Sequence, residues 1–175
     1  MDEQERIGEE IAKRALREGG VQALLYYDIH GGSQDALRNI MVGFIGRLVT
    51  EHGVLHAYGK IEQTQKDEEA GSFFTSAEVK MVFRDFNSLA MLCAKYLPIG
   101  VEILKPNEIK LNVGEAQTML LNVATIANEY AEEAIKKTVS PEELKAYERK
   151  LLKKEELGRM LLARKKGEED GGKKE

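Results

Sequence analysis

Hydrophobic positions in the first 64 residues predict a helix, a strand, a second helix and a second strand, in that order. Residues 2–18 place apolar residues every three or four positions among charges, as an amphipathic helix does. Val21 to His30 is rich in aliphatic and aromatic residues, which favours a strand. Ser33 can cap a helix whose apolar stripe runs from Leu37 to Val49. Val54 to Thr64 alternates as a half-buried strand does.

The next part of the chain predicts the same kinds of element again. Residues 65–72 are polar and are expected to form a loop. Phe73 to Phe83 alternates with period two and should form a hairpin with the preceding strand. Phe86 to Leu97 has helical spacing and is followed by a proline that ends it. Val101 to Leu104 predicts a further strand, after which Pro106-Asn107 favours a tight turn that folds the next residues back alongside it.

The order of these elements over residues 21–111 predicts a split βαβ, or ferredoxin-like, fold. Right-handed crossovers place both helices on one face of such an antiparallel sheet. We therefore expect an α+β chain with a ferredoxin-like βαββαβ sheet, an N-terminal helix and a C-terminal two-helix extension. The expected parts are an amphipathic helix at 1–20, the ferredoxin-like domain at 21–111, the helical extension at 112–166 and a disordered tail at 167–175.

Two helices are predicted after the sheet. Asn112 and Glu115 form a capping-box pair, and apolar positions then step by three and four as far as Ala134. Ser140 and Pro141 are residue types that begin a further helix. Alanines on the first of these helices would let another helix approach closely.

The sheet face turned away from the two crossover helices is predicted to be too apolar for contact with water alone. Alternation assigns to it Leu24, Tyr26, Asp28, His30, Val54, His56, Tyr58, Lys60, Phe74, Glu78, Lys80, Val82, Glu102 and Leu104. Because a large uncovered apolar patch usually marks a contact surface, we expect the long helix or a second subunit to cover it. The predicted interface consists of Tyr26, Tyr58 and Phe74 on the sheet and Leu120, Val123, Ala127 and Tyr130 on the helix.

Signals of catalysis or metal binding are weak in this sequence. Asp28, His30 and His56 share a predicted strand face, and a carboxylate with two imidazoles can hold a metal ion or transfer protons. The predicted strand order puts the two histidines at opposite ends of the sheet, however, which favours a structural role. Gly31-Gly32-Ser33 lacks the other residues of a phosphate-binding loop, and Cys93 falls on an apolar helix stripe. We expect no enzyme activity, no cofactor and no metal site.

The charge distribution suggests a second kind of partner. The chain has a formal net charge of −4, but its segment from Leu144 to Lys166 carries nine basic and three acidic residues. Such a segment can bind nucleic acid, or it can lie against an acidic protein surface. Nucleic-acid contacts would come from Lys145, Arg149, Lys150, Lys153, Lys154, Arg159, Arg164, Lys165 and Lys166. The aromatic rings of the sheet could also stack on RNA bases, but the acidic residues of the same face would repel phosphate: Asp28, Glu62, Glu78 and Glu102.

Membrane and secretory signals are not found in this sequence. The longest nearly apolar run, Ile40 to Ile45, is far shorter than the ~20 residues of a membrane span. The acidic opening MDEQERIGEE lacks the basic and apolar regions of a signal peptide. A single cysteine suits a reducing compartment. We therefore expect a cytoplasmic protein without membrane contact.

Residues 76–115 contain a local match to a known family. Tyr96-Leu97-Pro98-Ile99-Gly100 forms an aromatic-glycine turn, and the strand sequence VEILKP follows from Val101 to Pro106. This part resembles the C-terminal extension that follows the WYL domain in bacterial transcription regulators, where such a turn precedes a VEVLEP-like strand. The resemblance implies a ferredoxin-like module for oligomerisation or effector sensing. It carries over no functional residue, because this chain has neither the WYL motif nor a helix-turn-helix.

Together these patterns predict a non-catalytic, homo-oligomeric interaction or regulatory module. Nucleic-acid binding through the basic C-terminal helix stays open as one alternative. Small-molecule sensing, with an effector bound at a subunit boundary, stays open as another.

Overall fold

The computed structural model describes most of the chain as far as residue 138. It covers residues 3–68 and 71–138, and beyond them only Glu143, Arg149, Lys150, Leu152, Lys153, Glu156, Leu157 and Met160. The chain divides into two compact units, residues 1–126 and 127–175. The first unit contains a five-stranded antiparallel sheet with helices packed on it, which confirms the predicted α+β class. The predicted tail, 167–175, lies outside the described residues, as does most of the helix predicted from Ser140.

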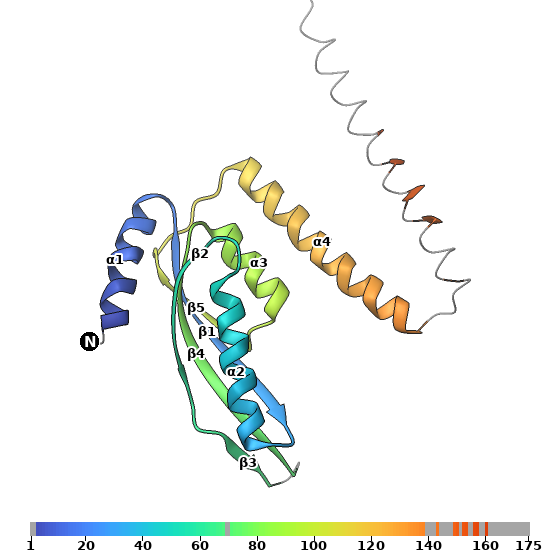
Figure 1. Cartoon of the computed structure of the whole chain (residues 1–175). Coiled ribbons are helices and arrows are strands. Elements are labelled where there is room, and N and C mark those ends of the chain that lie inside the picture. The colour runs from blue at the N-terminus through green and yellow to red at the C-terminus, as the bar shows by residue number, and fades with distance from the viewer. Residues whose placement is uncertain are drawn as a thin grey trace, which may run out of the picture. The chain divides into compact units, whose positions relative to one another are not determined.

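Helices and strands follow one another closely along the described chain. Their bounds are α1 Glu3–Arg17, β1 Val21–Gly31, α2 Gln34–Val49, β2 Val54–Ile61, β3 Gln65–Asp67, β4 Ser72–Phe83, α3 Phe86–Tyr96, β5 Gly100–Lys105 and α4 Val113–Thr138. Figure 1 shows α2 and α3 on one side of the sheet and α1 on the other. In the part of the chain that is described, every helix is too short or too polar to cross a membrane.

The sheet has the strand order β2-β4-β1-β5, and β3 pairs with the start of β4. The two central strands, β1 and β4, run side by side from Val21 opposite Phe83 to Gly31 opposite Phe73. β5 pairs with the other side of β1, and β2 with the other side of β4. All of these pairs are antiparallel. The strand order therefore ends on β2 at one side and on β5 at the other.

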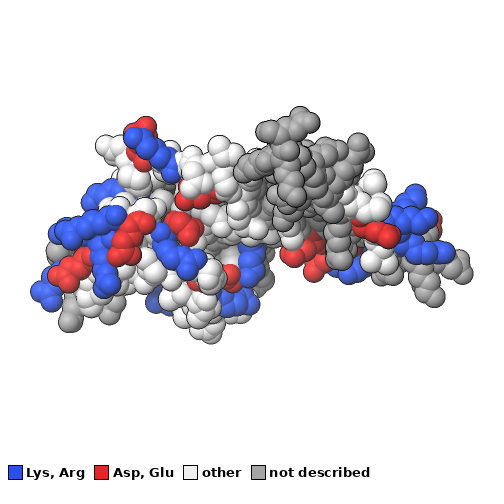
Figure 2. Space-filling view, turned by 90° about the horizontal axis from the view of Figure 1, so that it is seen from above, with Lys and Arg blue, Asp and Glu red and all other residues white. Residues whose placement is uncertain are grey.

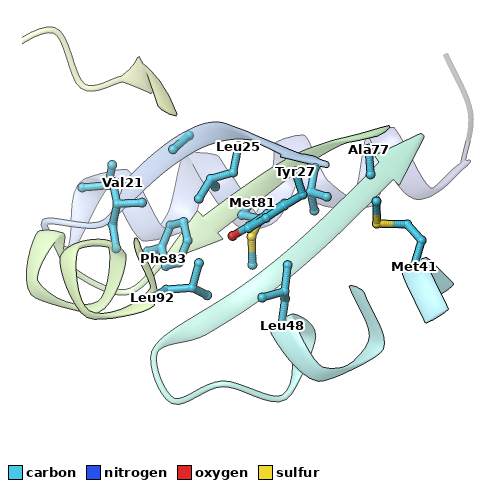
Figure 3. Close-up of a cluster of buried hydrophobic side chains, with 12 residues drawn as sticks. Val21, Leu25, Tyr27, Met41, Leu48, Ala77, Met81, Phe83 and Leu92 are labelled. Carbon is cyan, nitrogen blue, oxygen red and sulfur yellow. The ribbon is translucent and has the colours of Figure 1, made fainter. Parts of the chain in front are cut away.

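The hydrophobic core lies between the sheet and helices α2 and α3. Alternate residues of the two central strands point into it, as their period-two pattern predicts, and Leu25, Met81 and Phe83 are fully buried. In Figure 3 these side chains point toward Leu48 of α2 and Leu92 of α3. The larger set of buried residues in this cluster comprises Val21, Ala23, Leu25, Tyr27, Met41, Leu48, Ala77, Val79, Met81, Phe83, Leu89 and Leu92.

Helix α1 covers one end of the opposite sheet face. Ala12 and Ala15 are buried against Val82 of β4, and the Lys80 ammonium donates a hydrogen bond of 2.9 Å to Glu9. The sequence predicts that the long helix or a second subunit covers this face, but at this end α1 covers it instead. The reason is the tight glycine turn between α1 and β1, which returns the helix directly onto the strand that follows.

Three local predictions differ from the structure. The polar segment 65–72 was expected to be a loop, but it contains β3, whose backbone pairs with the first residues of β4 and needs no apolar side chain. Residues 109–111 are predicted to fold back alongside β5, but in the structure they form no strand. Val54 packs on the core rather than on the opposite face, because the ladder between β2 and β4 shifts register between Val54 and His56.

The apolar stripe of α2 is narrower in the structure than in the sequence. Leu37, Met41 and Leu48 are buried, whereas Ile40 and Val49 of the predicted stripe are 51% and 44% exposed. Ser33 stands at the N-cap position, as predicted, but its hydroxyl makes no capping hydrogen bond. Helix α2 is therefore held by these three buried side chains together with Phe44 and Ile45, which are partly buried and pack on the core.

Neighbouring residues of α2 provide a test of this packing. The Met41→Ala change should lower the free energy of unfolding by about 2–5 kcal/mol, because Met41 is fully buried and its removal leaves a cavity. The Val42→Ala change, on the exposed side of the same helix turn, should alter it by less than about 0.5 kcal/mol. Urea denaturation followed by circular dichroism measures both. Similar losses for the two variants would contradict the placement of α2.

Candidate interaction surfaces

Helix α4 exposes apolar side chains along much of its length. Four predicted interface residues lie on it at a spacing of three or four, and we call them the α4 seam: Leu120, Val123, Ala127 and Tyr130. Leu120, Val123 and Tyr130 are 67%, 41% and 45% exposed. None of the 26 residues of α4 is buried. Leu120 and Val123 of the seam therefore place apolar side chains at the surface of the described part of the chain.

The start of α4 is held by the capping box that the sequence predicts. The Asn112 backbone N–H donates to the Glu115 carboxylate, and the Glu115 backbone N–H donates to the Asn112 side-chain oxygen, both at 2.9 Å. Asn122 further along the helix donates to Asn87 of α3 at 3.3 Å. These three contacts are all polar. Because most helical stability in proteins comes from packing of an apolar face, packing of α4 against another protein surface would stabilise this helix.

The predicted sheet residues Tyr26, Tyr58 and Phe74 share the face opposite α2 and α3. The register places Tyr26 opposite Glu78 and Tyr58 opposite Lys80, while Phe74 lies opposite His30. Tyr58 is 37% exposed, and the other two rings are half-buried. Each ring has its own neighbours, so the three do not form one stacking surface.

Acidic groups surround Tyr26 on this face. Its hydroxyl lies 3.4 Å from Glu102 of β5 and can donate to that carboxylate. Burial raises the pKa of Tyr26, and the charges of Glu102 and Glu78 raise it further. The two lysines of the face, Lys60 and Lys80, both pair with nearby glutamates. A phosphate backbone would meet uncompensated negative charge here, which argues against RNA stacking.

The charge pattern elsewhere is mixed. Basic and acidic side chains are interspersed on the face that Figure 2 shows. Of the predicted nucleic-acid contacts, Arg149, Lys150 and Lys153 are described, and they are exposed helical residues. The remaining predicted contacts lie outside the described residues: Lys145, Lys154, Arg159, Arg164, Lys165 and Lys166.

The two predicted histidines lie at opposite ends of the sheet face, as expected, and only His30 is close to Asp28. His30 Nε2 lies 2.8 Å from the Asp28 carboxylate, and the His30 ring stacks on Phe74 with centroids 5.8 Å apart. His56 lies at the other end of the face, opposite Val82 and beneath α1. Within the described residues no group of three or more His, Cys, Asp or Glu side chains is arranged to hold a metal ion.

The single cysteine lies against the core. Cys93 is half-buried on α3 and packs on the buried cluster. Burial raises the pKa of its thiol, so little thiolate forms near neutral pH. The neighbouring Tyr27 hydroxyl is buried without a hydrogen-bond partner in the described part of the chain, and burial raises its pKa as well. Neither group is placed to act as a nucleophile or a base.

A groove that the sequence did not predict lies where α3 and α4 begin. We call it the α3–α4 groove, and its volume is about 430 Å³. Phe86, Ile109 and Met119 give it apolar walls, while Asp85 and Lys110 are among its polar residues. It forms because the chain leaves β5 and crosses an irregular stretch to the capped start of α4. The volume is sufficient for a small organic molecule. Two adjacent helix starts were the only sequence signal for it.

Asp85 caps α3 at the rim of this groove. One carboxylate oxygen accepts hydrogen bonds from the backbone N–H and the hydroxyl of Ser88, both at 2.7 Å. The other accepts from the Arg84 guanidinium at 3.3 Å. Burial raises the pKa of Asp85, but these hydrogen bonds outweigh it and hold the pKa below its ordinary value. Both oxygens are engaged, so this carboxylate is a structural cap rather than a free base.

Comparison with protein families assigns the chain to one family. A model of the MJ0538 family matches residues 22–164. This range includes the sheet and α4, and it extends into the basic C-terminal segment. No curated protein and no solved structure matches the chain. The match gives a family, and it says nothing about a ligand or a reaction.

The role of Asp85 as a cap can be tested by pH. At neutral pH the Asp85→Ala variant should be less stable than the wild type by about 0.5–2 kcal/mol, whereas Asp85→Asn, which keeps a good cap, should lose only a few tenths. Because the folded-state pKa is depressed, the advantage of the carboxylate is present above the ordinary pKa of aspartate and is lost as pH falls through the folded-state pKa. The gap between wild type and Asp85→Ala should therefore narrow in acid. A gap of constant size in urea titrations at pH 7 and pH 3 would contradict this.

Proposed function

We propose that this chain, which belongs to the MJ0538 family, is a non-catalytic module that associates with further copies of itself. The observation that carries the proposal is the α4 seam, since a helix of 26 residues with no buried residue exposes Leu120, Val123 and Tyr130 together. The uncovered part of the sheet face around Tyr26, Tyr58 and Phe74 would add to the contact. No described cluster of side chains supports a catalytic role instead.

The physical reason for self-association is the removal of the seam from water. Each buried apolar Å² contributes roughly 25 cal/mol, and three large side chains on one helix line make this term substantial. Ala127 within the seam permits close approach of a second helix. A two-fold symmetric contact presents the same seam from both copies, so each leucine meets an apolar neighbour.

The proposed fold type is the ferredoxin-like one, with β3 as an addition to it. Support comes from the strand order β2-β4-β1-β5 and from the position of α2 and α3 on a common face. We further propose a cytoplasmic location, which fits the single half-buried cysteine.

A second candidate function is small-molecule sensing, which the α3–α4 groove favours. Its volume of about 430 Å³ and its mixture of apolar walls with charged residues suit a small organic effector. The resemblance of residues 76–115 to the extension of WYL-domain regulators would also fit an effector-sensing role. The groove lies beside the start of α4, so a bound effector would contact the helix that bears the seam.

Self-association is tested with two leucines of α4. Analytical ultracentrifugation at micromolar concentration should find the wild type larger than a monomer. The Leu120→Glu variant should have a lower average mass than the wild type, because the change places a charge in the seam. Leu121→Glu is the matched control, since Leu121 is 70% exposed on the same helix but lies off the seam. A monomeric wild type would remove the proposal. Equal effects of both variants would show that the seam is not the contact.

The groove is tested by a thermal-shift screen of metabolites. An effector present at 100 times its dissociation constant should add about 2.7 kcal/mol of stability. Thr118→Trp, which fills the groove, should abolish the shift. Thr125→Trp should leave it unchanged, because Thr125 makes the same kind of hydrogen bond to the carbonyl four residues earlier but does not line the groove. A shift that survives Thr118→Trp would place the effector elsewhere.

A further inference from the structure

The strand β5 forms an edge of the sheet that differs from the opposite edge. Its inner side pairs with β1, and within the described residues no strand pairs with its outer side. On the other edge strand, β2, the residues that face the helices pack on the core, as Val54, Ala57 and Ile61 do. A strand edge with unpaired backbone groups is a template for another strand, and proteins normally blunt or cover such an edge.

The outer edge of β5 carries an apolar row on the helix side of the sheet. Val101 lies opposite the buried Leu25, and Ile103 opposite the buried Ala23, so both face the same way as the core residues. They are nevertheless 46% and 43% exposed. Ile99, two positions before Val101 and just ahead of the strand, is 70% exposed. The helices α2 and α3 thus leave the helix side of the sheet uncovered at the β5 edge.

Two features limit the length of edge that another strand could use. Pro98 has no backbone N–H to donate, which ends pairing on one side. The register of β5 against β1 shifts between Ile103 and Lys105, and Lys105 forms an ion pair of 3.8 Å with Glu9 beneath α1 on the opposite face. The uninterrupted stretch is therefore residues 99–103, and its middle residue is Val101.

The register of self-pairing follows from the charges and the bulge. Antiparallel pairing about a two-fold axis puts one residue opposite its own copy. If that residue were Glu102, two carboxylates would face each other, which is destabilising. If it were Ile103, Val101 would have to pair beyond the bulge with Lys105. With Val101 on the axis, Ile99 meets Ile103 in each half, and Glu102 lies opposite Gly100, which has no side chain.

We propose that β5 pairs with β5 of a second copy of this chain, with Val101 opposite Val101, so that two sheets continue as one. The inference rests on the proposed self-association and names a surface for it. A second copy is the favoured occupant because the stretch is self-complementary: its apolar row is symmetric about Val101, and its one charge meets a glycine. A two-fold symmetric contact requires a self-complementary stretch, whereas pairing with an unrelated strand does not require one.

The test is disulfide formation at the axis. Residues directly opposite in an antiparallel pair have Cα atoms about 4.5–5.5 Å apart, which lies within the range that a disulfide spans. In a Cys93→Ala background, which removes the native thiol, Val101→Cys should give covalent dimer as the main product under mild oxidation. Ile103→Cys alone is the matched control and should stay uncrosslinked. A mixture of Ile99→Cys chains with Ile103→Cys chains should crosslink again.

The outcomes separate this inference from the proposed function. If sedimentation shows an oligomer but Val101→Cys does not crosslink, β5 pairing is overturned and self-association through other surfaces stands. If Ile103→Cys alone crosslinks as readily as Val101→Cys, the proposed register is wrong. If the wild type is a monomer and no variant crosslinks, both proposals fall. All three cysteine sites are partly exposed positions in or just before β5, and circular dichroism of the reduced variants verifies that each still folds.

Discussion

The antiparallel ladder between β1 and β4 is the constraint on which the rest of this structure depends. It runs without interruption from Val21 opposite Phe83 to Gly31 opposite Phe73, and it fixes which side chains point to each face. One face receives Leu25, Val79 and Met81, which are fully buried beneath α2 and α3. A slip of one residue would turn that whole set toward the opposite face, so burial of the core and the register support each other.

The opposite face is divided between two environments because α1 is shorter than the sheet is long. Near Val82 it is dry, and the charges of Lys80 and Glu9 are paired. Toward Tyr26 and Phe74 it is half-buried and bears several carboxylates. The ring-bearing part of the face is therefore poorly suited to a polyanion, and a protein surface is the better match for it. Self-association is our proposal for the role of this face, of the α4 seam and of the β5 edge.

The three candidate surfaces differ in which features of the local structure define them. The α3–α4 groove has structural carboxylates at its rim, since Asp85 and Glu115 are engaged as helix caps. The α4 seam follows a capped helix start, and none of its residues is buried. The β5 edge has a defined length between Pro98 and the register shift before Lys105. Each of these limits comes from local backbone geometry rather than from a reactive side chain, which fits an interaction role.

The sequence by itself determined the elements whose apolar spacing is regular. β1, β4, α3 and α4 lie within a residue or a few of their predicted bounds, and the capping box at Asn112 formed as expected, because these features depend on neighbours along the chain. Only the tertiary structure decided that α1 covers one end of the second face, that Val54 turns into the core and that Val101 and Ile103 stay exposed. Those outcomes depend on helix length against sheet length and on a register shift, which are relations between distant segments that no local pattern encodes.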